Sequence, residues 1–189
     1  GPPVIAAQTV SDPNGNGFAQ RFLGGWIHTS SHGTYASPTQ VMTAFSAEGW
    51  IRGRLGWPSD EAQCGGAANA CVQRFANGTL VATSAAGAVL PVAVANAYET
   101  SGGPTGPWGH PLAVPQKVTD PNGNGDAWQL QNGWIHSSAS GTYFSPTQIM
   151  TEYSRRGWLR GSLGWPTGPA TCYAGGCVQT FQRGTIDTR

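Results

Sequence analysis

Apolar and polar residues alternate in short segments of this chain, and turn-forming residues separate the segments. Trp26 and His28 flank Ile27, which predicts a strand with Ile27 toward the core and the two rings on the opposite face. The preceding loop, Asp12-Pro-Asn-Gly-Asn-Gly17, is rich in residues that favour turns. We therefore expect a hairpin tip there, between strands at residues 6–10 and 18–22.

Three other segments have the apolar spacing of a helix. Val41, Met42 and Phe45 fall on one side of a helix that would begin at Ser37-Pro38, with Ser37 as the N-cap, and would end at Gly49. Residues 91–98 predict a second helix of this kind, and Ile149, Met150 and Tyr153 predict a third. Each helix is short and needs neighbouring elements for its stability.

The stretch Trp50–Pro58 recurs 108 residues later as Trp158–Pro166, and only Gly109 and Pro111 of its glycine-x-proline skeleton recur near the midpoint. The repeating unit is therefore about 54 residues long. Its copies span residues 4–58, 59–111 and 112–166, with a partial copy at 167–189. Because one unit is too small to bury its apolar side alone, we expect one α+β domain over residues 1–189. In it, tandem units of a β-hairpin plus a short helix would pack as a pseudo-symmetric closed or arc-like assembly.

Composition limits the classes of partner. Ten Lys and Arg residues balance nine Asp and Glu residues without a basic or acidic run, so we expect neither nucleic acid nor membrane insertion. Twenty-eight glycines and fourteen prolines indicate many turns, and eight tryptophans argue against disorder.

The four cysteines form two close pairs in the sequence. We predict the disulfides Cys64–Cys71 and Cys172–Cys177, which would place the protein in an oxidising, extracytoplasmic compartment. Zinc is the alternative, and the lack of a nearby histidine in either unit argues against it.

The candidate ligand-binding residues are aromatic. Trp26, His28 and Tyr35 recur as Trp134, His136 and Tyr143, whereas the unit between them has Thr79, Val81 and Val89 near the corresponding places. A flat ring beside polar tips suits a sugar, whose apolar face stacks on the ring. The alternative is that these rings fill joints between units. We assign Trp50, Trp57, Trp158 and Trp165 to the core, and Arg52, Arg54 and Arg160 to a solvated rim.

Chemistry beyond binding has little support. The carboxylates are scattered, no nucleophile elbow occurs, and we expect no catalytic residue, no metal and no cofactor. Asp12–Gly17 and Asp120–Gly125 fit the first half of a calcium loop. Leu23 and Gln131 stand where that loop needs a bidentate glutamate, so we interpret both segments as turns.

Two sets of short motifs resemble those of the LGFP repeat family. Leu55-Gly-Trp-Pro58 and Leu163-Gly-Trp-Pro166 are similar to the family's first signature. Its second signature, an aromatic or leucine followed by glycine and an apolar strand residue, is similar to residues 22–27, 75–80, 130–135 and 181–186.

The resemblance implies a secreted module of actinobacterial exported proteins that binds cell-wall polysaccharide, either peptidoglycan or arabinogalactan. It implies a non-catalytic anchor located in the extracellular cell wall, which we expect to be a monomer. The alternatives are a secreted cell-wall hydrolase and a protein–protein interaction module.

Overall fold

The computed structural model describes all residues from 1 to 189. The fold is α+β, with four small antiparallel sheets and three α-helices. It divides into two compact units, residues 1–90 and 91–189, and each is described by itself below. The sheets are open meanders of three or four strands, so none closes into a barrel. The prediction of a two-stranded hairpin in each copy was therefore too small, because further strands extend every hairpin.

The first unit holds two sheets with one helix between them in the sequence. Its elements are β1 (Gln8–Asp12), β2 (Gly15–Phe22), β3 (Gly25–Ser30), β4 (Gly33–Pro38), α1 (Thr39–Ala47), the 3-10 turn Trp50–Arg52, β5 (Gln63–Gly65), β6 (Ala70–Phe75), β7 (Gly78–Ala82) and β8 (Gly87–Val89). Strands β1 to β4 form the first sheet and β5 to β8 the second. The predicted hairpin tip is confirmed, since Asp12 pairs with Gly15 across a two-residue turn.

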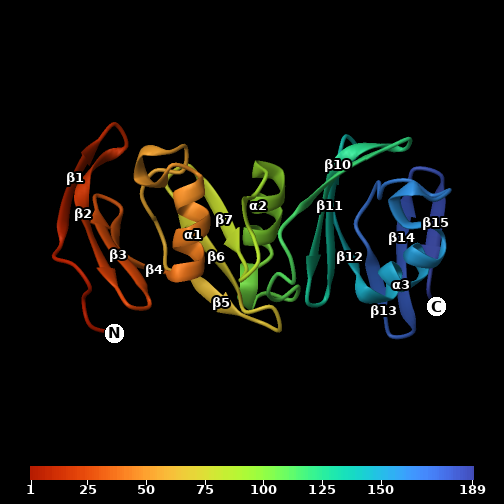
Figure 1. The fold of residues 1–189 in the computed structure, drawn as a ribbon. Helices are drawn as coiled ribbons and strands as arrows, with labels where there is room; N and C mark the ends of the chain where they lie inside the picture. Colours follow the sequence, from red (N-terminus) through yellow and green to blue (C-terminus); the bar gives the residue numbers. More distant parts are fainter. The chain divides into compact units, whose positions relative to one another are not determined.

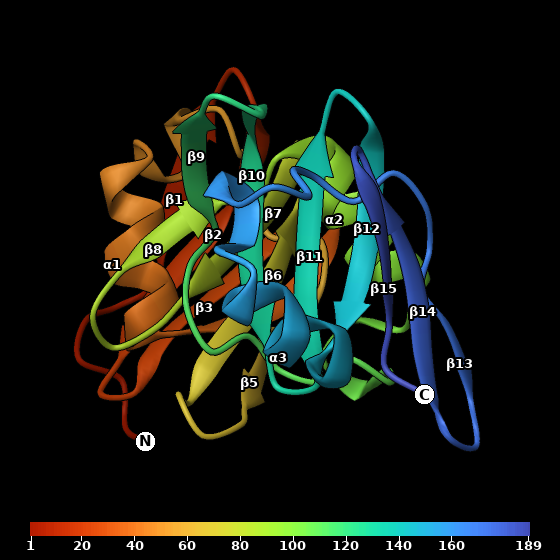
Figure 2. The same cartoon turned by 90° about the vertical axis from the view of Figure 1, so that its right-hand side faces the viewer.

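The second unit begins with a helix and also holds two sheets. Its elements are α2 (Val92–Thr100), the 3-10 turn Gly103–Thr105, β9 (Gln116–Asp120), β10 (Gly123–Leu130), β11 (Gly133–Ser138), β12 (Gly141–Pro146), α3 (Thr147–Arg155), the 3-10 turn Trp158–Arg160, β13 (Thr171–Tyr173), β14 (Gly176–Phe181) and β15 (Gly184–Asp187). Figure 2 shows β9 to β12, the third sheet, side by side in sequence order. The fourth sheet has three strands, β13 to β15.

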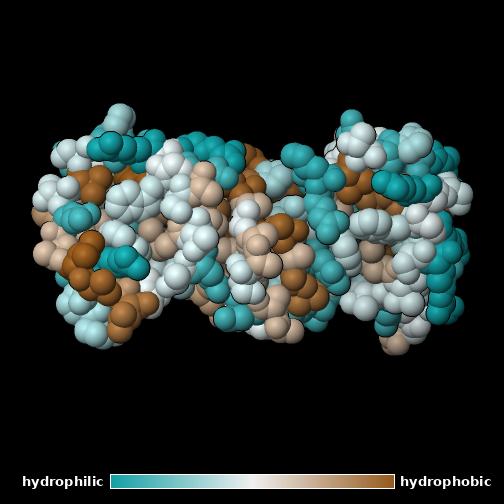
Figure 3. Space-filling model, viewed as in Figure 1, coloured by the Kyte–Doolittle hydropathy of each residue, from teal (hydrophilic) through white to brown (hydrophobic).

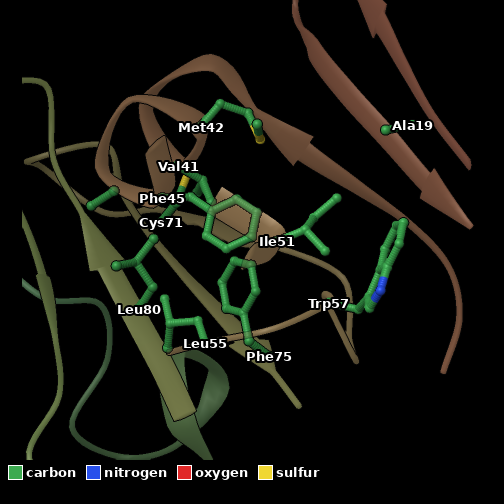
Figure 4. Close-up of a cluster of buried hydrophobic side chains, with 11 residues drawn as sticks. Ala19, Val41, Met42, Phe45, Ile51, Leu55, Trp57, Cys71, Phe75 and Leu80 are labelled. Carbon is green, nitrogen blue, oxygen red and sulfur yellow. The ribbon is translucent and has the colours of Figure 1, made fainter. Parts of the chain in front are cut away.

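Helix α1 packs between the first and second sheets of its unit (Figure 1). Its buried face is the predicted stripe of Val41, Met42 and Phe45, and the Phe45 ring lies 4.5 Å from the ring of Phe75 on β6. Figure 4 shows this cluster, with Trp57 on the side nearer the strand that carries Ala19. Helix α3 contacts the third and fourth sheets, and Tyr153 packs on Phe181 at 4.6 Å.

The helix starts differ from the prediction. Pro38 is the N-cap of α1, and no side chain caps the helix. Ser37 is buried and its hydroxyl lies 3.3 Å from Nδ1 of His28. The serine therefore satisfies a buried imidazole instead of a helix N-terminus, which local sequence preference could not reveal.

A second difference concerns the direction of Ile27. Trp26 and His28 do share a face of β3, but that face packs toward α1, and His28 is only 1% exposed. Ile27 is 39% exposed and lies on the outer face of the first sheet with Phe18. Figure 3 shows hydrophobic surface over these N-terminal strands. The equivalent Ile135 is fully buried, because α2 packs on that face of the third sheet.

Candidate functional site

A groove of about 530 Å³ opens in the first unit between the first sheet and α1. It is lined by Gln8, Arg21, Phe22, Leu23, Gly25, Trp26, Thr39, Met42, Thr43, Ser46 and Trp50. The sheet contributes Trp26 and, directly opposite it on β2, Arg21. The helix contributes an exposed hydroxyl row that includes Thr43 and Ser46. The groove therefore combines apolar walls with polar groups, as small-ligand sites do.

Two tryptophan rings form the apolar corner of this groove. The rings of Trp26 and Trp50 are 5.3 Å apart at an interplanar angle of 69°, and both side chains are half-buried. An edge-to-face pair of this kind is stabilised by the ring quadrupoles and leaves part of each ring in contact with solvent. A flat apolar group entering the groove could therefore stack on one ring and touch the edge of the other.

His28 lies behind these rings and does not line the groove. Its imidazole is stacked on Trp26 at 6.3 Å and has Trp50, Trp57 and Phe45 between 6.2 and 6.4 Å away. Burial lowers the pKa of His28 to about 4, because the charged form would lose its hydration. Nε2 is buried without a partner. His28 is therefore a neutral, buried support for Trp26.

Trp50 adopts a backbone conformation that bulky residues avoid. Its φ is 59°, and the equivalent Trp158 has φ 56°. In the copy between them the same place is taken by Gly103, with φ 58°. A left-handed backbone costs a bulky residue on the order of 1 to 3 kcal/mol, whereas glycine adopts it freely. Two copies thus keep a tryptophan where the backbone favours glycine, which indicates that the ring itself is needed.

The hairpin tip of the first sheet fixes the backbone under Trp50. The Asn14 side chain donates hydrogen bonds to the carbonyls of Ile51, at 2.7 Å, and Gly53, at 3.1 Å. Asp12 accepts the backbone N–H of Asn14 and closes the turn. These contacts give the turn interpretation of the Asp-Pro-Asn-Gly-Asn-Gly loop a structural basis. No group of three or more His, Cys, Asp or Glu side chains lies close enough together to hold a metal.

The same arrangement recurs in the second unit. Trp134 and Trp158 are 5.2 Å apart at 70°, and His136 stacks on Trp134 at 6.2 Å. The His136 ring also contacts Tyr153, and burial lowers its pKa to about 3. Eight of the eleven groove residues have an identical counterpart 108 positions later: Gln116, Gly133, Trp134, Thr147, Met150, Thr151, Ser154 and Trp158. The three that differ are Arg21, Phe22 and Leu23, replaced by Gln129, Leu130 and Gln131.

The structure separates the predicted Trp, His and Tyr sets. Trp26 lines the groove, and Trp134 holds the same position on β11. Tyr35 and Tyr143 lie opposite the histidines in the sheets. Their hydroxyls donate to the carbonyls of His32 and Ser140, at 2.7 and 2.8 Å, in the turn before each tyrosine. Tyr35 is not among the groove residues, so its local role is to close the turn.

Sequence reasoning placed all four corner tryptophans in the core, and the structure divides them. Trp57 and Trp165 are 1% and 0% exposed, so their assignment to the core is confirmed. Trp50 and Trp158 are half-buried; Trp50 lines the groove and Trp158 is its counterpart. The replacement of tryptophan by Gly103 in the copy between them was the available signal, because a core position seldom accepts that change. Arg52, Arg54 and Arg160 are exposed, as expected of a solvated rim.

Both predicted disulfides are present, Cys64–Cys71 and Cys172–Cys177, and no cysteine is free. Each joins the first two strands of its sheet. Disulfides persist in oxidising compartments, so they indicate an extracellular protein. None of the helices is long and apolar enough to cross a bilayer.

The fold is thus an α+β array of small sheets and short helices whose proline corners carry a duplicated aromatic pair. Residues 55–106 match the LGFP repeat family. That stretch is an LGFP repeat, and the resemblance seen in the sequence is confirmed there. The match begins at Leu55, so the family's unit starts at the corner and continues through the second sheet and α2. A comparison with curated proteins found no match to this chain.

Proposed function

We propose that this protein is a non-catalytic module that binds glycan in the Trp26–Trp50 groove and at its Trp134–Trp158 counterpart. By this binding it would anchor an exported protein on cell-wall polysaccharide, either peptidoglycan or arabinogalactan. The observation that carries the proposal is the retention of Trp50 and Trp158 in a left-handed backbone that Gly103 occupies without strain. A strained residue is retained where its side chain has a function, and these rings border a solvent-filled groove.

The chemistry of the lining suits a sugar. The CH-bearing face of a sugar ring is apolar and stacks on an aromatic plane, while its hydroxyls need hydrogen-bond partners at the edge. Thr43 and Ser46 donate to helix carbonyls at 3.0 and 2.9 Å, so their oxygen lone pairs remain able to accept from a ligand hydroxyl. The side chains of Gln8 and Thr39 make no hydrogen bond within the protein and add further donors and acceptors.

The lining also supports binding over hydrolysis. Arg21 is its single ionisable side chain, so no carboxylate stands beside a ligand in the groove. Glycoside hydrolysis normally needs two carboxylates on either side of the scissile bond. Two weak sites on one chain would gain from simultaneous contact with a polymer, whose effective concentration at the second site rises once the first is occupied.

The test is retention on purified wall fractions of the parent and two double variants. We expect Trp26→Ala/Trp134→Ala to lower the fraction retained at least tenfold, because the stacking surface is lost. Trp50→Gly/Trp158→Gly should have the same effect while leaving the corner backbone unstrained. Tyr173→Ala is the matched control, since this exposed aromatic lies in the fourth sheet outside the groove.

Three results would contradict the proposal in different ways. Failure of the parent to bind walls would rule out anchoring itself. Unchanged retention of both double variants would move the site elsewhere. Release of reducing ends from the walls by the parent would favour the hydrolase alternative.

A further inference from the structure

The two aromatic grooves differ at three positions, and one difference changes the charge. Arg21 lies directly across from Trp26 in the first sheet, and Gln129 lies directly across from Trp134 in the third. The other two differences, at Phe22 and Leu23, exchange apolar residues for Leu130 and Gln131 and introduce no charge. The first groove therefore has a positive charge beside its stacking ring, where the second has a neutral amide.

The guanidinium of Arg21 has no partner within the protein. Its side chain makes no hydrogen bond or ion pair, whereas Arg54 pairs with Glu48 at 2.8 Å and Arg156 pairs with Glu152 at 2.8 Å. Arg52 and Arg160 also lack a partner, but neither lines the groove or stands at an equivalent of a groove residue. No carboxylate among the lining residues competes for Arg21. An anionic ligand group could therefore reach this guanidinium without first breaking an ion pair.

We infer that the first groove selects a sugar residue that bears an anionic group, a carboxylate or a phosphate, and that Arg21 binds this group while Trp26 stacks on the ring. The second groove, with Gln129, takes a neutral sugar. Arginine binds both anions through two parallel N–H donors, and an adjacent aromatic plane fixes the sugar ring that bears the anion. This inference rests on the proposed glycan function and names the ligand class of each groove.

The experiment isolates each groove by removing the other. Trp134→Ala leaves the first groove active, and Trp26→Ala leaves the second. Each variant is tested for retention on untreated walls, on walls whose carboxylates have been reduced to alcohols, and on walls stripped of phosphate. For Trp134→Ala we expect one of the two treatments to lower retention about tenfold, and that treatment identifies the anion. For Trp26→Ala neither treatment should lower retention.

Substitution of Arg21 supplies the residue-level test. In the Trp134→Ala background, Arg21→Gln should lower retention on untreated walls about tenfold and abolish its dependence on salt between 50 and 500 mM, since the lost contact is ionic (about a Debye length of screening separates these conditions). Arg21→Lys should keep the salt dependence at reduced affinity, because it keeps the charge and loses the paired donors. Gln129→Arg in the Trp26→Ala background should create the same dependence in the second groove. Arg52→Gln, an exposed arginine outside the groove, is the control.

The inference would be overturned if Arg21→Gln left retention unchanged, or if neither wall treatment affected Trp134→Ala. Loss of all retention in Trp134→Ala alone would also overturn it, since the first groove would then not bind by itself. These results differ from a failure of the glycan proposal, in which the parent protein is not retained on any wall fraction.

Discussion

The corner after α1 and the corner after α2 share a backbone but not their side chains. Gly49, residue 50 and Gly56 have φ values of 90°, 59° and 70°, and Gly102, Gly103 and Gly109 have 98°, 58° and 70°. In the first corner tryptophan follows at residues 50 and 57, whereas the second has Gly103 and His110 at those places. The turn is therefore built by its glycines and proline.

The difference shows that the tryptophans serve other purposes than making the turn. Trp57 fills the core and donates from Nε1 to the carbonyl of Gly15 at 3.1 Å. Trp50 forms the wall of a groove. His28, whose ring lies against both, has Val81 as its counterpart 53 residues later. Four substitutions or conditions would break or sharpen this comparison, and they follow from the largest expected effect to the smallest.

Trp57→Ala should cost the most. Loss of a fully buried tryptophan destabilises by about 3 to 5 kcal/mol, because apolar burial is lost and a cavity remains. The same substitution at Trp165, which is also fully buried, should act equally. His110→Ala, at the matching place of the second corner, should cost less than about 1 kcal/mol. Urea unfolding followed by far-UV circular dichroism measures these values, and equal costs at residues 57 and 110 would refute the division between the corners.

Acidification should destabilise through the two buried histidines. His28 titrates near pH 4 in the folded protein and near 6.5 when unfolded, so the unfolded state binds more protons between these values. Stability is therefore fully present above pH 6.5 and falls as the pH drops through this window, by about 2 kcal/mol for each histidine between pH 6.5 and 4.5. His136 behaves in the same direction.

The control for this pH effect is His28→Val/His136→Val, which installs the residue found at Val81. Its free energy of unfolding should fall by about 4 kcal/mol less than that of the parent over the same pH range. An identical pH dependence in the parent and the variant would mean that these histidines are not the source.

Asn14→Ala should have an intermediate effect. The substitution removes both side-chain hydrogen bonds to the carbonyls of Ile51 and Gly53, and each such bond contributes about 1 kcal/mol. We expect a loss of about 1 to 2 kcal/mol in urea unfolding and weaker ligand retention, because the backbone under Trp50 is no longer tied to the hairpin tip. Asn16→Ala, two residues later on β2, serves as the control, and an equal loss there would argue against a specific clamp.

Trp50→Gly and Trp50→Ala should differ by the least. Both remove the ring and should weaken retention equally, but alanine keeps a Cβ at φ 59° and glycine does not. Trp50→Gly should therefore be more stable than Trp50→Ala by about 1 kcal/mol. The same pair of substitutions at Ile51, a buried position with no positive φ, should show the opposite order, since glycine loses more entropy there.

Much of the local structure could be predicted from the sequence. Turn chemistry placed the hairpin tip at Asp12–Gly17, apolar spacing placed the stripe of α1, and the short separation of the cysteines gave both disulfides. These features depend on residues close to one another in the chain. The single-domain boundaries and the packing of all units as one assembly stay predictions.

The sequence by itself determined where strands, helices and corners begin and end, because φ preferences, turn residues and apolar periods act over a few positions. Only the tertiary structure decided which face of β3 is buried, since alternation defines two faces without saying which one α1 will cover. It likewise divided Trp50 from Trp57, two rings seven residues apart with the same local sequence signals. Burial depends on which elements meet in space, and for this chain those meetings join the first sheet, α1 and the second sheet across tens of residues.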